Sequence, residues 1–91
     1  MPTIDRIAGF RVGFFSCDLC EPPHVHVERG EGQAKFWLRP VTLEWSRGFA
    51  RHELREAERI IRSRRGFYME RWHAHIRRRD TPARREGPSD A

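Results

Sequence analysis

The pattern of apolar and polar residues divides the chain into a strand-forming first half and a helix-forming second half. Residues 24–28 alternate strictly, which places Val25 and Val27 on one face of a strand and both histidines on the other. Turn residues at 30–32 then favour a hairpin, and Pro40 ends the strand that follows. The pattern predicts an antiparallel sheet of three or four strands. They are expected over residues 10–16, 24–28, 34–38 and 41–45.

The second half shows helical spacing. Phe49 and Leu54 stand around Ala50 at the spacing of a hydrophobic staple, which predicts that a helix begins there. Gly66 is expected to end or kink this helix, and a second helical stripe follows it. The predicted fold class is therefore α+β, with a three- to four-stranded antiparallel sheet followed by two C-terminal helices packed on one face. The two apolar stripes consist of Leu54, Ala57, Ile60 and Ile61, and of Phe67, Tyr68, Trp72 and Ile76.

The length of 91 residues fits a single domain, predicted over 1–79, with a disordered basic tail over 80–91. A chain of this size buries only about 60–65% of its unfolded surface, so its core is thin. Three Trp and six Phe nevertheless indicate that a core exists. The thin core and the open edges of such a sheet favour a homodimer or a complex with a partner.

No apolar run approaches the roughly 18 residues of a membrane span, and no signal-peptide pattern follows Met1. We therefore expect a cytoplasmic protein without a membrane partner.

The formal net charge of +5 is unevenly distributed. Residues 1–46 carry five basic and six acidic side chains, whereas residues 47–91 carry thirteen arginines and seven acidic side chains. Helical spacing places four arginines within roughly 80° of one another. Such a face suits RNA, DNA or an acidic partner protein, and the alternative is a solvated surface partly neutralised by Glu58 and Arg62. The four are Arg51, Arg55, Arg59 and Arg62.

Two cysteines and two histidines lie within ten positions of one another. Two thiolates and two imidazoles match a tetrahedral structural Zn²⁺ site, so Cys17, Cys20, His24 and His26 form a candidate metal site. The spacing between the two pairs is shorter than in common zinc modules. The alternative is a pair of incidental loop cysteines beside structural histidines, and in that case we expect no cofactor.

The same histidines support a catalytic hypothesis. His24 and His26 could move protons in a metal-independent ribonuclease, because general acid–base catalysis on RNA needs two such groups. The alternative is that Pro22 and Pro23 fix the entry of a strand and that the histidines serve structure. Whether the protein is an enzyme stays open at this stage.

The sequence resembles a small bacterial family of unknown function, numbered forty-one sixty. The motifs that carry the resemblance are Glu21 to Val27 (EPPHVHV), Ala34 to Leu38 with Pro40, Arg47 to Phe49, Glu53-Leu54, and Trp72 with His75. The resemblance extends to about Arg79. It implies one component of a toxin–antitoxin-like two-gene system, with a small partner protein from the neighbouring gene. It implies no activity, and it adds Lys35 to the candidate binding residues.

Two positions depart from the family pattern. Relatives lack the cysteines found here at Cys17 and Cys20, which weakens the zinc hypothesis. Relatives also often carry Ser where this chain has Ala50, and losing that capping side chain should destabilise the helix start by about 1 kcal/mol.

Overall fold

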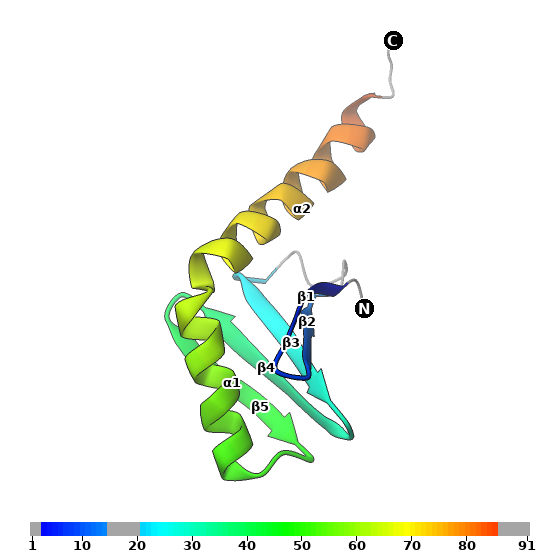
Figure 1. The fold of residues 1–91 in the computed structure, drawn as a ribbon. Coiled ribbons are helices and arrows are strands. Elements are labelled where there is room, and N and C mark those ends of the chain that lie inside the picture. Colours follow the sequence, from blue (N-terminus) through cyan, green and yellow to red (C-terminus); the bar gives the residue numbers. More distant parts are fainter. Residues whose placement is uncertain (1–2, 15–20, 86–91) are drawn as a thin grey trace.

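The computed structural model describes residues 3–14 and 21–85, and these form an antiparallel five-stranded sheet followed by two helices (Figure 1). The strands lie in the sheet in the same order as in the chain. The predicted α+β class, with two helices after the sheet, is confirmed. The elements are β1 (Thr3–Ile7), β2 (Phe10–Gly13), β3 (His24–Arg29), β4 (Gly32–Leu38), β5 (Val41–Arg47), α1 (Arg51–Ser63) and α2 (Arg65–Arg85).

Three or four strands were predicted and the sheet has five, because the prediction left out β1. This strand is short and carries Asp5 and Arg6 at its centre, so it lacks the apolar alternation that marks the other strands. It joins β2 through Ala8 and Gly9, whose φ angles of 54° and 81° are both positive. Positive φ at both turn residues is the geometry of the tight type I′ hairpin, which holds Ile7 opposite Phe10.

One face of the sheet, the inner face, carries the apolar core and is covered by the helices (Figure 1). Val25 and Val27 point into this core, as the strict alternation of β3 predicts. Helix α1 contributes Ala57 and Ile61, and α2 contributes Tyr68 and Trp72. The other buried apolar residues come from the strands and from Phe14, which follows β2; those of the strands are Phe10, Val12, Val25, Val27, Ala34, Phe36, Leu38 and Val41.

The two helices meet at Arg64, two residues before the glycine at which we expected a break. The amide of Arg64 still donates to the carbonyl of Ile60 at 3.0 Å, and the Arg64 carbonyl accepts from the amide of Tyr68 at 3.1 Å. Asp5 of β1 accepts hydrogen bonds from Arg64 Nε at 2.6 Å and from the Tyr68 hydroxyl at 2.9 Å. Burial and the hydrogen bond to Asp5 raise the pKa of Tyr68 well above its ordinary value. The first strand is thereby tied to the junction between the helices.

The face opposite the helices, the open face, is shaped by a bulge in β5. Lys35 pairs with Trp45 and the next residue, Phe36, pairs with Leu43, so Glu44 is an extra residue in the edge strand. The bulge brings Trp45 onto the open face beside Lys35. Glu44 accepts a hydrogen bond from the indole N–H of Trp37 at 2.7 Å.

Helix α2 runs past the sheet and points away from it at its C-terminal end (Figure 1). It extends to Arg85, six residues into the segment that we expected to be a disordered tail, and residues 86–91 lie outside the described part. Among the described residues, no helix is long and apolar enough to cross a membrane.

Candidate nucleic-acid interface

The four arginines grouped by helical spacing lie on one exposed face of α1, which we call the arginine face (Arg51, Arg55, Arg59 and Arg62). The opposite side of α1 buries Ala57 and Ile61 in the core. Because that apolar stripe holds the helix on the sheet, the cations are presented to solvent. They extend over about 16 Å along the helix axis.

The acidic residues of α1 are mostly engaged away from the arginine face. Arg29 of β3 contacts the carboxylates of Glu53 and Glu56 at 3.4 and 3.2 Å. Glu58 is the remaining acidic residue, and it accepts two hydrogen bonds from Arg62 at 2.8 and 3.0 Å. The charge of the arginine face is therefore reduced by a single carboxylate, and the face stays strongly positive.

A shallow hollow of about 310 Å³ lies on the arginine face, lined by Arg55, Glu58, Arg59 and Arg62. Within the described residues, Arg51, Arg55 and Arg59 form no hydrogen bond or ion pair. Guanidinium groups bind phosphate through paired N–H donors, so such a hollow can hold a phosphate group. The arrangement suits a polyanion along the helix.

The start of α1 lies where the sequence predicted it, directly after Ala50, and local contacts fix it there. Ala50 is the N-cap residue, and Phe49 and Leu54, which have the spacing of a hydrophobic staple, both pack against the core. The side chain of Glu53 accepts a hydrogen bond from the Ala50 amide at 2.7 Å. That bond, together with Arg29, lowers the pKa of Glu53. The first turn of the arginine face is therefore held in place from both sides.

Lys35 does not join the arginine face. It lies on the open face of the sheet and is only 9% exposed, whereas α1 packs on the inner face. Its ammonium contacts Glu21 at 2.7 Å and lies 4.6 Å from the centre of the Trp37 ring. The structure thus separates Lys35 from the four arginines with which it was predicted to bind a partner.

His24 and His26 lie next to each other on β3, with ring centroids 5.3 Å apart. His24 is fully buried, its Nδ1 lies 3.0 Å from the Pro22 carbonyl, and its ring packs near Trp72 at 5.0 Å. A general acid or base must reach its substrate, and a fully buried ring cannot do so without rearrangement. The geometry therefore favours a structural role for His24.

The zinc hypothesis depends on two cysteines that lie outside the described residues. Cys17 and Cys20 lie outside the described part of the chain, so the candidate set with His24 and His26 has no geometry to report. Among residues 3–14 and 21–85, no three His, Cys, Asp or Glu side chains are grouped as metal ligands.

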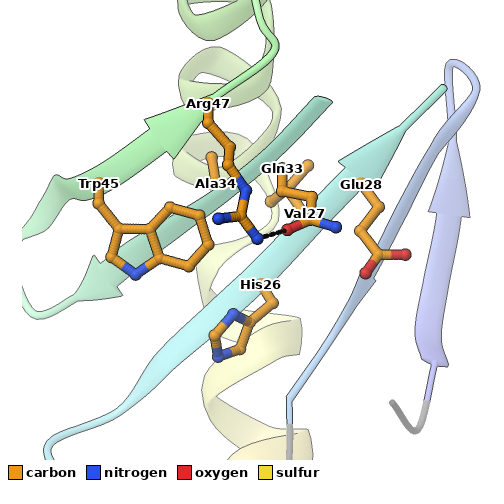
Figure 2. Close-up of a pocket in the computed structure, with 7 residues that line it drawn as sticks. All are labelled: His26, Val27, Glu28, Gln33, Ala34, Trp45 and Arg47. Carbon is orange, nitrogen blue, oxygen red and sulfur yellow. Dashed lines mark hydrogen bonds between the residues drawn. The ribbon is translucent and has the colours of Figure 1, made fainter. Parts of the chain in front are cut away.

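A second site, on the open face, was not predicted. Figure 2 shows Trp45, Arg47, Gln33, Glu28 and His26 around a pocket of about 270 Å³. Arg47 donates a hydrogen bond to Gln33 at 2.9 Å, and its guanidinium carbon lies 5.6 Å from the centre of the Trp45 ring. The missed signal was the pairing register. The faces on which the β5 side chains lie can be assigned only when β5 is paired with β4, because the bulge at Glu44 shifts the alternation.

A family model described as a domain of unknown function, DUF4160, matches residues 9–73, which include β2 to β5, α1 and the start of α2. Comparison with curated proteins finds no match, and comparison with solved structures finds none either.

Proposed function

Since the chain belongs to the DUF4160 family, whose description assigns no activity, we propose a function from its surface: an interaction module that binds the phosphate backbone of nucleic acid through the arginine face. One observation carries this proposal. Three of the four exposed arginines have no hydrogen bond or ion pair within the described residues, while Arg29 holds two of the three acidic side chains of α1.

Binding through this face should not depend on the base sequence of the nucleic acid. Exposed guanidinium groups contact phosphate oxygens, and each neutralised phosphate releases counterions, so affinity falls steeply with salt. With three or four phosphates contacted, the slope of log K against log salt on duplex DNA should be about −3. Between about 50 and 200 mM salt, affinity should then fall roughly 40- to 150-fold.

The test is a titration of a labelled duplex, followed by fluorescence anisotropy at several salt concentrations. Replacing Arg55 and Arg59 together by Gln should weaken binding and reduce the slope by about two, since two phosphate contacts are lost. Arg39→Gln with Arg71→Gln is the matched control, because both residues are exposed, lie off α1 and change the charge equally. That variant should retain the wild-type slope.

The alternative ligand is a small acidic partner protein, as expected for one component of a toxin–antitoxin-like pair. The same face would then bind carboxylates. A tagged protein recovered from its host with and without nuclease treatment separates the two cases. Recovery of one small protein that survives nuclease, with no duplex binding in vitro, contradicts the nucleic-acid proposal.

A further inference from the structure

The open face of the sheet carries two rows of side chains that cross several strands. One row runs from Gly13 on β2 through His26 and Lys35 to Trp45 on β5. The second row lies beside it, and its members are Arg11, Glu28, Gln33 and Arg47. The pocket of Figure 2 lies where these rows meet on β3, β4 and β5.

The first row ends in an exposed aromatic side chain, Trp45. Trp45 is 39% exposed, which makes it one of three large apolar side chains among the described residues that are exposed. The ring centroids of His26 and Trp45 lie 6.3 Å apart and their planes are inclined by 58°, so the two rings form adjacent walls of the pocket. Because Gly13 has no side chain, the row is open at the β2 end. An exposed indole in a pocket is a stacking surface for a planar ring.

The second row offers polar groups to the edge of such a ring. Arg47 uses one N–H on the Gln33 side-chain oxygen, and a guanidinium has five N–H donors in all. The amide nitrogen of Gln33 has no hydrogen-bond partner among the described residues. Glu28 forms an ion pair with Arg11, which keeps the carboxylate at the far end neutralised. The row therefore combines donors for ring oxygen and nitrogen atoms with a net positive charge.

We propose that this pocket holds one nucleobase, stacked on Trp45, with Gln33 at its edge and Arg47 beside its phosphate. The flat face of a base is accessible in a single strand and hidden in a duplex, so the open face selects single-stranded nucleic acid. The inference rests on the proposed function in that it names the form of nucleic acid bound, and it adds a contact surface on the opposite side of the sheet from α1. The pocket volume of about 270 Å³ suits one ring system and is smaller than most sites for larger ligands.

The experiment measures binding of a labelled single-stranded RNA and of its duplex by fluorescence anisotropy. Trp45→Ala should weaken single-strand binding roughly 5- to 150-fold, the range for loss of one base–aromatic stack, and leave duplex binding unchanged. Trp45→Phe retains an aromatic face and should restore most of the affinity. Leu43→Ala is the matched control, because Leu43 is 42% exposed on the same strand but pairs with an inner-face position.

A second measurement identifies the source of the base. Quenching of tryptophan fluorescence by AMP or UMP, absent in Trp45→Phe, would mean that the pocket accepts a free nucleotide as well as a base in a strand. Quenching by the oligonucleotide alone would assign the pocket to the strand. If neither probe quenches Trp45 fluorescence, the pocket holds no base and the inference is wrong.

The two proposals fail in different ways. If Trp45→Ala binds the single strand as tightly as the wild type, the stacking inference is overturned while the role of α1 stands. If the variant of Arg55 and Arg59 binds both forms normally while Trp45→Ala loses the single strand, the proposed function of the arginine face is wrong and the pocket remains. A wild-type protein that binds neither form overturns both.

Discussion

The start of α1 offers a stabilising substitution, Ala50→Ser. Ala50 is the N-cap residue with φ −76° and ψ 163°, the extended geometry in which a serine hydroxyl reaches the amides of the first turn. Half of a capping box already exists, because Glu53 accepts from the Ala50 amide at 2.7 Å. A serine would supply the other half by accepting from the amide of His52 or Glu53.

The structure limits the size of the gain. A serine cap is typically worth 0.5–2 kcal/mol over alanine, on the order of 1 kcal/mol. The Glu53 amide already donates to the Ala50 carbonyl at 3.0 Å, so the hydroxyl gains less than it would from an unpaired donor. We therefore expect a stabilisation of about 0.5–1 kcal/mol. For a domain of this size, that corresponds to a rise in Tm of roughly 2–8 °C.

The assay is thermal unfolding followed by circular dichroism, with urea unfolding as a second measure of the free energy. Ala50→Thr and Ala50→Val form the matched pair, because their side chains have the same shape and differ in the hydroxyl. The threonine variant should be the more stable of the two. Equal stability of this pair, together with an unchanged Tm for Ala50→Ser, would refute the capping argument.

Two further predictions concern an ionisation and the turns. Tyr68 is the sole tyrosine, and because its folded-state pKa is raised, its contribution to stability is complete below pH 10 and is lost as pH rises towards the folded pKa. Phenolate absorbance of the folded protein should therefore appear well above pH 10, and Asp5→Asn should lower the pH at which it appears. Phenolate absorbance of the wild type that appears near pH 10 would contradict this. Gly30→Ala should destabilise the fold by about 1–2 kcal/mol in urea unfolding, because φ is 59° there. Gly48→Ala should lower the free energy of unfolding by about 1–3 kcal/mol more than Gly30→Ala does, because its Cβ would also lie 2.6 Å from the Glu31 carbonyl oxygen. Equal destabilisation by the two substitutions would refute the argument from this clash.

Local pattern was sufficient for much of the fold. The alternation of residues 24–28 predicted that Val25 and Val27 enter the core, although it did not predict the burial of His24 beside Trp72, and the staple spacing around Ala50 predicted where α1 begins. Both are properties of adjacent residues, so the sequence carries them directly. The exposed arginine face follows from helical spacing in the same way.

Contacts between distant residues could not be predicted from local pattern. β1 was missed because its central Asp5 looks like a loop residue until Arg64 and Tyr68 are brought to it. The helix break lies at Arg64 rather than at Gly66, and Arg64 is also the residue whose side chain donates to the distant Asp5. Lys35 was predicted to bind together with the arginines because the family motif that contains it does not say which face of the sheet its side chain occupies.

The order of the strands has a consequence for how the chain folds. Each strand of the described sheet pairs with its neighbours in sequence. Three of the hairpins close over two residues, at 8–9, 30–31 and 39–40, whereas ten residues separate β2 from β3, and short loops close quickly. The bonds from Asp5 to Arg64 and Tyr68 span 59 and 63 residues, so they form after the sheet and both helices have met. In native-state hydrogen exchange, the amides of β1 should then exchange faster than those of β3 and β4. The bonds of Asp5 to Arg64 and Tyr68, which form last in folding, would therefore be the first to break.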